Sequence, residues 1–423
     1  MRSSGALAPA LRDAARMLAS VAGGRSLADL LDAGGAADTS RAALIDLTHG
    51  TLRRYGRVQA IVAALSSRGG PDAELEPLLW CALYALESGR YAEYTVVDQA
   101  VRACGLLERW SAKSYVNALL RRYLRERASL EAKIGADVQA RYQHPRWWLE
   151  TLRAAHPERW EEIAAQGNTH PPMCLRVNSR RAAPAEYAAR LAQAGIAQRA
   201  LGGAALLLER PLPVERLPGF AAGEVSVQDA GAQRAPHCLD LHAGQRVLDA
   251  CAAPGGKSAH LLECADIQLT AIDIDPARCE RIGRNLARLG LDATVRAADA
   301  TRPEAWWDGV AFDRILADVP CTASGIARRH PDLKWLRREA DVAAFAARQG
   351  ALLDALWRVL VAGGKLLYVT CSVFPQENEA VTGAFLSRTA GAAHLPLPDG
   401  AAAQWLPDAE HDGFFYSLLQ KQA

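Results

Sequence analysis

The stretch Val247–Ser258, VLDACAAPGGKS, constrains the fold of this 423-residue chain more than any other. It begins as a short apolar run of the kind that forms a buried parallel strand. It then passes through the turn 254–256, Pro-Gly-Gly, into a segment that can start a helix. Such a turn lets a ligand approach the backbone and points free helix N–H groups at it. Asp273 ends a second apolar run, 24 residues beyond Asp249, where an acid can accept hydrogen bonds from ribose hydroxyls. The pattern predicts a nucleoside pocket.

Three kinds of nucleotide site could use this turn. The dinucleotide fingerprint G-x-G-x-x-G is absent, which argues against a nicotinamide enzyme. A phosphate-binding P-loop, G-x-x-x-x-G-K-[ST], would match Gly256, Lys257 and Ser258, but Cys251 occupies its leading glycine position. An S-adenosylmethionine site needs an adenosine cradle without a triphosphate grip, and no residue for it is missing. We therefore expect S-adenosylmethionine as the cofactor.

Strands and helices alternate from Gly223 onward, and we expect an α/β fold with a doubly wound, mostly parallel seven-stranded sheet. Ligands bind at the carboxyl ends of the strands in such sheets. The predicted strands are Glu224–Gln228, Arg246–Ala250, Leu269–Asp273, Ala293–Arg296, Arg314–Ala317, Lys365–Thr370 and Phe414–Leu419.

The rest of the chain has a different texture. Residues 1–138 show apolar positions at helical spacing in segment after segment, which predicts an all-α domain. Two arginine clusters within it, at 53–57 and 121–127, could follow RNA phosphates or simply face water. Residues 139–220 are rich in loops and prolines and predict a small α+β connecting subdomain, so the domain with the large sheet occupies residues 221–423.

Composition narrows the setting. The longest apolar run, Leu78–Leu86, has nine residues and is too short to span a membrane. The nine cysteines are scattered without a C-x-x-C pair, so we expect neither a disulfide framework nor a zinc site. Reduced cysteines suggest the cytoplasm. We expect a monomer without bound metal, and the net charge of +2 permits a polyanionic partner without demonstrating one.

Two later strands end in cysteines. The segment RILADVPCTASG places Asp318 and Cys321 at one strand end, and LLYVTCS places Cys371 at the next. If these strands are neighbours, both thiols and the carboxyl group share one crevice with the cofactor. A lone buried cysteine usually serves as a small apolar side chain, whereas two beside a cofactor suggest thiol chemistry.

Methylation at carbon 5 of a pyrimidine needs such a set of groups. That carbon is too weakly nucleophilic to take a methyl group directly, so a thiolate must first add to carbon 6. An acid at the N3 and N4 edge of the ring stabilises the charge that develops there. A base then removes the carbon 5 proton and the thiolate leaves. The target base must be unstacked to enter the pocket.

At these residues the chain resembles the RsmB/Sun/Fmu family of ribosomal RNA cytosine-5 methyltransferases. The segments VLDACAAPGGK, DVPCTASGIARRHPDLKW and YVTCSVFPQEN carry the resemblance, and PPMCLRVN, SVQDAGAQ, VNALLRR and DGFFYSLLQK extend it over nearly the whole chain. It implies a Rossmann-like class I S-adenosylmethionine methyltransferase domain preceded by a NusB-like RNA-binding domain. It also implies small-subunit ribosomal RNA as the partner, methylated before assembly is complete, with cytosine 967 as the family's target.

The resemblance also implies roles for individual residues. Cys371 would be the nucleophile, Cys321 would assist product release, and Asp318 would lie between cofactor and base; spacing alone does not distinguish the two cysteines. Lys257 could contact either the base or the cofactor carboxylate, and Asp275 could share the ribose role. The cofactor-binding residues would be Ala250, Cys251, Ala252, Ala253, Pro254, Gly255, Gly256, Lys257, Asp273, Asp299 and Asp318.

The loop Gly325–Arg338, GIARRHPDLKWLRR, is the strongest RNA-binding candidate outside the catalytic set. Its cations could hold phosphates while a ring stacks on a base. A lid whose charges only face water is the alternative. The predicted RNA-binding residues are Arg328, Arg329, His330 and Lys334.

Two rival functions stay open. The substrate could be transfer RNA or another ribosomal RNA cytosine. The protein could instead be a non-catalytic RNA-binding assembly factor that keeps the fold, although the intact Cys371, Cys321, Asp318 and Lys257 argue against this.

Overall fold

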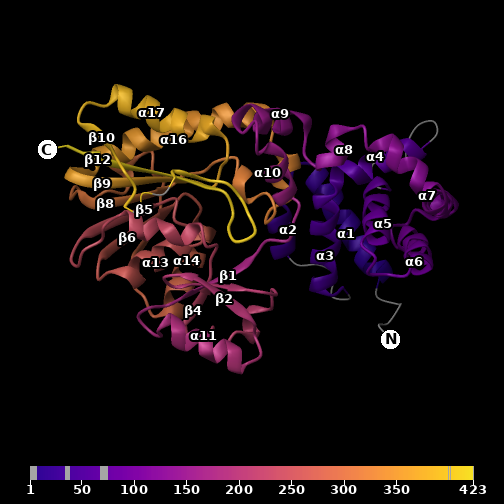
Figure 1. The fold of residues 1–423 in the computed structure, drawn as a ribbon, viewed down its shortest axis with the longest axis horizontal. Coiled ribbons are helices and arrows are strands. Elements are labelled where there is room, and N and C mark those ends of the chain that lie inside the picture. The colour runs from indigo at the N-terminus through magenta and orange to yellow at the C-terminus, as the bar shows by residue number, and fades with distance from the viewer. Residues whose placement is uncertain (1–6, 34–38, 67–74, 399, 401, 423) are drawn as a thin grey trace. The chain divides into compact units, whose positions relative to one another are not determined.

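The computed structural model describes residues 7–33, 39–66, 75–398, 400 and 402–422. The chain divides into two compact units (Figure 1), residues 1–170 with 327–339 and residues 171–326 with 340–423. We call them the helical unit and the α/β unit. The predicted domain boundaries at 138/139 and 220/221 therefore fall inside units, since the helices before residue 170 pack with the helical unit and the strands after it with the α/β unit.

The helical unit carries its apolar residues at helical spacing, as predicted. In its first helix Leu7, Leu11 and Leu18 are buried along one stripe, the arrangement of a helix that covers a core. Helix α5 is buried nearly all round, which fits its apolar sequence EPLLWCALYALE. The helices are α1 (Leu7–Ala22), α2 (Leu27–Asp32), α3 (Arg41–Arg53), α4 (Tyr55–Leu65), α5 (Glu76–Glu87), α6 (Glu93–Leu106), α7 (Lys113–Ile134), α8 (Val138–Tyr142), α9 (Arg146–Ala155), α10 (Trp160–Gln166) and α15 (Leu333–Leu336).

The segment 327–339, which we call the insert, belongs to the helical unit although it follows a strand of the α/β unit in sequence. The indole Nε1 of Trp335 donates to the carbonyl of Leu52 at 3.0 Å. The amide of Leu27 donates to Asp332 Oδ2 at 2.9 Å. These long-range bonds, together with α15, make the insert part of the packing of the helical unit.

The α/β unit contains two sheets, and the smaller one is antiparallel with the order β2-β3-β1-β4. Its strands are β1 (Met173–Val177), β2 (Gln198–Gly202), β3 (Ala205–Leu208) and β4 (Val225–Val227), and α11 (Pro184–Gln193) packs on it. The strand predicted at 224–228 lies here and not in the large sheet, because Val227 pairs with Leu175 of β1.

The large sheet has the order β10-β12-β9-β8-β5-β6-β7, with β11 beside β12. The five strands from β7 to β9 in this order are parallel, whereas β12, β10 and β11 pair antiparallel. The mostly parallel sheet is thus confirmed. The strands are β5 (Arg246–Ala250), β6 (Gln268–Asp273), β7 (Thr294–Ala297), β8 (Phe312–Asp318), β9 (Leu360–Thr370), β10 (Ala392–Leu395), β11 (Gln404–Trp405) and β12 (Phe414–Lys421).

Helices cover both faces of the large sheet (Figure 1). Helices α12 (Ala235–Cys238), α13 (Gly256–Cys264) and α14 (Pro276–Leu289) lie on one face, and α16 (Glu339–Arg358) and α17 (Glu379–Arg388) on the other. Side chains alternate between the two cores, so that Val247 joins the first and Leu248 the second. The prediction of a doubly wound sheet is confirmed. In the described part of the chain no helix has the length and apolarity to cross a membrane.

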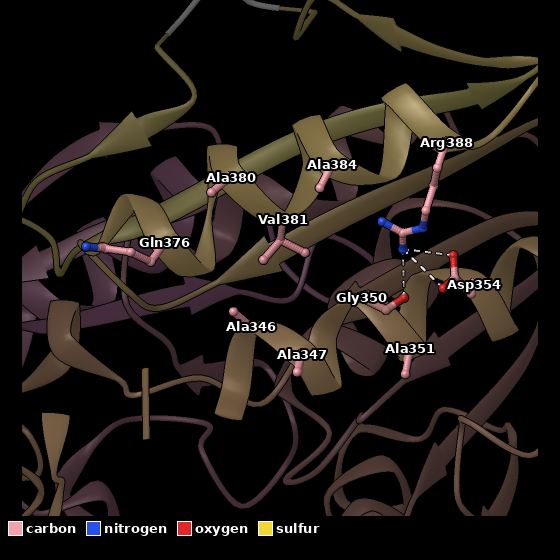
Figure 2. A pocket seen from close by; sticks show the side chains of 10 residues that line it. All are labelled: Ala346, Ala347, Gly350, Ala351, Asp354, Gln376, Ala380, Val381, Ala384 and Arg388. Atoms are coloured by element: carbon pink, nitrogen blue, oxygen red, sulfur yellow. Dashed lines mark hydrogen bonds and ion pairs between the residues drawn. The ribbon is translucent and has the colours of Figure 1, made fainter. Parts of the chain in front are cut away.

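A cavity of about 510 Å³ lies between α16 and α17 (Figure 2). Alanine and glycine line most of it, and at one end Arg388 Nη2 donates to Asp354 Oδ1 at 2.9 Å. None of the predicted catalytic residues lines this cavity. The predicted chemistry lies elsewhere, at the carboxyl ends of the parallel strands.

Candidate active site

The glycine turn joins the end of β5 to the first residue of α13. Gly255 has a φ of +93° and precedes the helix as its N-cap. A Cβ on it would lie 3.1 Å from both Cα and Cγ2 of Ile282, so a side chain there would crowd α14 as well as strain the backbone. Glycine is favoured at position 255 because the backbone there is left-handed and closely packed against α14.

Asp249 ends β5 in a fully buried position beneath this turn. Its Oδ2 accepts a hydrogen bond from Ser258 Oγ at 2.5 Å, whereas Oδ1 has no protein partner. Burial raises the pKa of Asp249 to about 7, against the lowering effect of the Ser258 hydroxyl. A buried carboxyl oxygen without a partner leaves a polar position at the strand end that a bound ligand can satisfy.

Asp273 ends β6 and supports the turn directly. Its Oδ2 accepts from the amide of Ala253 at 3.1 Å, and its side chain is 2% exposed. Asp275, two residues on, uses Oδ1 to cap α14 by accepting from the amide of Ala277 at 2.8 Å. The carboxylate of Asp275 is therefore engaged as a helix cap, and Asp273 is engaged too, since its Oδ1 accepts from the amide of Asp275 at 3.2 Å.

Asp299 follows β7 and also lies at the carboxyl edge of the sheet. Its Oδ1 accepts from the hydroxyl of Thr301 at 2.7 Å and from the Thr301 amide at 2.9 Å. Partial burial opposes ionisation of Asp299, but these hydrogen bonds outweigh it and hold its pKa below the usual value. Its charge complements the nearby guanidinium of Arg348.

Lys257 and Asp318 connect the turn to the end of β8. Lys257 Nζ lies 2.7 Å from Asp318 Oδ2, and 13% of the lysine side chain is exposed. Burial disfavours the charge on Lys257, but Asp318, and after it Cys371 and Asp249, raise its pKa above the ordinary value. A charged lysine is thus held beside the predicted nucleophile.

The two predicted cysteines lie side by side at the ends of neighbouring strands β8 and β9. Asp318 pairs with Val369 in register, and the Sγ atoms of Cys321 and Cys371 are 3.4 Å apart. Cys321 is buried, whereas Cys371 is partly exposed. The hydrogen bond with Cys371, followed by burial, raises the pKa of Cys321 well above its usual value. Cys321 therefore keeps its proton, and the more accessible sulfur belongs to Cys371.

A buried carboxylate that sequence reasoning did not single out braces both cysteine loops. Glu377 is fully buried; its Oε1 accepts from the amide of Thr322 at 2.7 Å and its Oε2 from Ser372 Oγ at 2.6 Å. Thr322 and Ser372 directly follow Cys321 and Cys371. The signal in the sequence was a Gln-Glu-Asn run close behind the second cysteine, but its role required knowing that the two loops meet.

A second unpredicted residue, Arg176 of β1, ties the smaller sheet to α13. It is fully buried, with Nη2 at 2.7 Å and Nε at 2.8 Å from the carboxylate of Glu263. Its Nη1 donates to the carbonyl of Gly256 at 2.7 Å, at the start of the helix. An arginine inside the apolar run MCLRV was the available signal, because a buried charge needs a partner.

The predicted RNA-binding residues of the insert separate into two groups. Arg328 and Lys334 are buried, with 2% and 0% exposure, and Lys334 Nζ donates to the carbonyl of Gln143 at 2.9 Å and to Asn168 Oδ1 at 2.6 Å. Both side chains are thus enclosed by the protein in this conformation, and RNA contact by them stays a prediction. Arg329 is half-buried and His330 exposed, so RNA contact remains a prediction for them.

The first predicted arginine cluster lines a cavity of about 440 Å³ within the helical unit. Arg57 donates from Nε to Glu87 Oε1 at 2.8 Å and also bonds Glu131. Arg53 donates to the carbonyl of Arg328 at 2.9 Å. Much of this positive charge is therefore engaged within the protein, in line with the alternative that a charge cluster serves the fold.

Three protein families match consecutive regions of this chain. The family described as 16S rRNA methyltransferase RsmB/F matches residues 236–420. The ferredoxin-like domain of RsmF/B-like methyltransferases matches residues 144–215, and the NusB family matches residues 10–125.

Curated relatives extend the match. Ribosomal RNA small subunit methyltransferase B of Vibrio cholerae is 44% identical over 388 residues, covering 90% of this chain and 89% of that protein. The protein of the same name from Pseudomonas putida is 43% identical, covering 97% and 98%. The chain belongs to the RsmB/F family of 16S rRNA methyltransferases. The resemblance inferred from its motifs is thus confirmed.

Solved structures share the fold. The crystal structure of PH0851 has a TM-score of 0.80 at 24% identity and covers 98% of this chain and 99% of that one. A methyltransferase homologue from Pyrococcus horikoshii has a TM-score of 0.59 at 28% identity, covering 67% and 97%. The second match leaves about a third of this chain without a counterpart.

Proposed function

We propose that this rRNA methyltransferase uses S-adenosylmethionine to methylate carbon 5 of a cytosine in 16S ribosomal RNA, through a covalent bond between Cys371 and carbon 6. The observation that carries the proposal is the 3.4 Å contact of Cys321 Sγ with Cys371 Sγ, at the strand end that also holds Asp318 and Lys257. Family membership suggests cytosine 967 as the target. We further propose that the enzyme works as a cytoplasmic monomer.

The residues at the strand ends suit the cofactor. The turn from Ala250 to Lys257 would hold its methionine part, Asp273 its ribose and Asp299 the neighbourhood of its adenine. The unpartnered Oδ1 of Asp249 supports a polar ligand at this edge. Carboxylates also complement a sulfonium charge. When bound, S-adenosylmethionine supplies the methyl group that carbon 5 receives.

Cys371 begins the reaction by adding its sulfur to carbon 6 of the base. Because Cys321 keeps its proton, it can donate a hydrogen bond to the Cys371 sulfur once Cys371 has given its own proton to solvent. The ammonium of Lys257 lies close enough to Cys371 to interact with its charge. Asp318 would lie at the base edge and hold the Lys257 ammonium 2.7 Å away, so that this cation balances the negative charge that develops on the ring once the carbon–sulfur bond has formed. Addition turns carbon 5 into a nucleophile.

Cys321 then assists release. Two of the causes that raise its pKa, the hydrogen bond and the charge of Cys371, disappear once the Cys371 sulfur is bonded to carbon. Cys321 is then more easily deprotonated, and after it has lost its own proton to solvent its thiolate can accept the carbon 5 proton. Loss of that proton restores the ring double bond and expels Cys371 as a thiolate, which completes the cycle.

Transfer of labelled methyl groups to unmethylated small-subunit RNA, with mapping of the modified base, tests the proposal. We expect incorporation at one cytosine and none into transfer RNA. Incorporation only into transfer RNA would assign a different substrate, and RNA binding without incorporation would indicate a non-catalytic assembly factor.

The cysteine roles are tested by two variants. Cys371→Ala is expected to abolish turnover, by at least about 10⁴-fold, while cofactor binding stays close to that of the wild type. Cys321→Ala is expected to trap a protein–RNA adduct that survives a denaturing gel. If Cys371→Ala traps the adduct and Cys321→Ala does not, the two roles are reversed.

A further inference from the structure

We propose that His237, His260 and Cys264 form a binding site for a divalent metal ion of the zinc class on the α/β unit. One ligand atom from each of these side chains lies within 4.8 Å of the others. Two imidazoles and a thiolate are ligands that zinc prefers. The site is separate in sequence from the two strand ends that carry Cys321 and Cys371.

The three ligands come from two helices. His260 and Cys264 stand four residues apart on α13, so their side chains share one face of the helix. His237 comes from α12, and its ring centroid lies 5.4 Å from that of His260 at an angle of 84°. Ligand atoms around a tetrahedral zinc are about 3.3 to 3.8 Å apart, from bond lengths of about 2.0 to 2.3 Å. A contraction of about 1 Å would close the site, and the exposed His237 and Cys264 can supply it.

His260 shows why a ligand is expected. It is 3% exposed, and its Nδ1 has no hydrogen-bond partner, although buried polar atoms are almost always satisfied.

A metal here would join α12 to α13, whose first residue is Gly256 of the cofactor turn. No motif in the sequence indicates this site, because two of the ligands are histidines and the third is a lone cysteine. We expected no zinc site because the chain has no C-x-x-C pair. A search for such pairs cannot detect ligands that come from two different helices.

Titration of the reduced, metal-free full-length protein with Zn²⁺ against a chromogenic chelator tests the proposal. We expect one equivalent to bind. His237→Asn and Cys264→Ser should each weaken binding by more than about 100-fold, since even the loss of an outer partner of a metal ligand costs up to that much. Both replaced residues are exposed, so the variants should fold. His242→Asn, at another exposed histidine, should bind as the wild type does.

Two further measurements separate this site from the active-site thiols. A Cys321→Ser/Cys371→Ser protein should retain the bound equivalent. Co²⁺ should give a thiolate-to-metal charge-transfer band that Cys264→Ser abolishes. The proposal is overturned if the wild type binds no Zn²⁺, if His237→Asn and Cys264→Ser bind it unchanged, or if binding disappears only with the active-site cysteines.

Discussion

Two lysines, the partly buried Lys257 at the strand ends and the fully buried Lys334 in the insert, show how differently the same side chain can be used. Lys257 lies 2.7 Å from the carboxylate of Asp318, and its pKa is raised. Lys334 donates to two neutral oxygens, and its pKa is lowered well below the usual value, chiefly by burial and further by Arg53. A carboxylate keeps the first lysine charged within a site, whereas the second is a hydrogen-bonding anchor of the fold.

A lysine that lies in a motif associated with ligand binding need not carry a charge or contact a ligand in the folded protein. Both lysines were predicted to contact ligands, one from a turn that matches nucleotide sites and the other from a basic loop. Each prediction depends on what surrounds the amino group after folding. A charge that has lost water needs a counter-ion to remain charged.

The largest expected effect is at Lys257. Lys257→Met should lower kcat/KM for methyl transfer by about 10²- to 10³-fold, as expected for removal of a buried charge that acts on the reacting groups. Single-turnover kinetics with labelled cofactor would measure it. Lys365→Met is the control, because Lys365 pairs with Asp240 at the surface. If Lys257→Met and Lys365→Met are equally active, the charge of Lys257 has no part in methyl transfer.

Lys334 should affect stability and leave chemistry intact. Lys334→Met leaves the Gln143 carbonyl and the Asn168 amide oxygen without their donor, which should lower the free energy of unfolding of the helical unit by about 1 to 3 kcal/mol. Denaturant unfolding followed by the helical signal would measure this. Lys133→Met, at an exposed site on α7, should change little. If Lys334→Met has a lower kcat but an unchanged free energy of unfolding, Lys334 acts in the reaction and does not stabilise the fold.

The pH dependence of this loss has a definite sign. The pKa of Lys334 is lower in the folded protein than in the unfolded chain, so the unfolded chain binds its proton more tightly. Burying the charged form of Lys334 therefore lowers the free energy of unfolding below the folded-state pKa. This destabilisation is relieved as pH rises toward about 10.4, the ordinary pKa of lysine. The stability of the wild type relative to Lys334→Met should therefore increase with pH. A pH-independent difference would contradict the lowered pKa.

Replacement of Glu377, which braces the two cysteine loops, should have a smaller effect on kcat. Glu377→Gln keeps the size of the side chain but weakens the charge-assisted hydrogen bonds from the two cysteine loops, and we expect kcat to fall about tenfold with little change in KM. The same variant should also lower the raised pKa of Cys321 toward its usual value, because the charge of Glu377 contributes to raising it. The rate of thiol alkylation as a function of pH would measure this change. Glu379→Gln, two residues on and exposed, is the matched control. Loss of stability without a change in alkylation would indicate a purely structural role.

The smallest effect is expected at Arg329, the half-buried arginine of the insert. If it contacts a phosphate, Arg329→Gln should weaken RNA binding by about fivefold and reduce the salt dependence by about one charge. Binding isotherms at several salt concentrations would show this, with Arg358→Gln on α16 as the comparison. An unchanged salt slope would leave the insert without a phosphate contact at this position.

The sequence by itself determined where strands β5, β6, β8 and β9 lie along the chain and which residues stand at their ends, whereas the structure showed that β8 and β9 are neighbours. Apolar runs at β5, β6, β8 and β9, a glycine turn and two cysteine motifs were sufficient to predict a doubly wound sheet and a shared crevice. The physical reason is that these signals are local: a buried strand must be apolar, and parallel strands place their carboxyl ends along one edge.

Only the tertiary structure decided which polar side chains are buried and with what partners. The burial of Lys334, the brace of Glu377 between two loops and the meeting of His237 with His260 depend on segments far apart in the chain. Hydrogen bonding and desolvation are set by neighbours in space, and a sequence pattern carries no record of them.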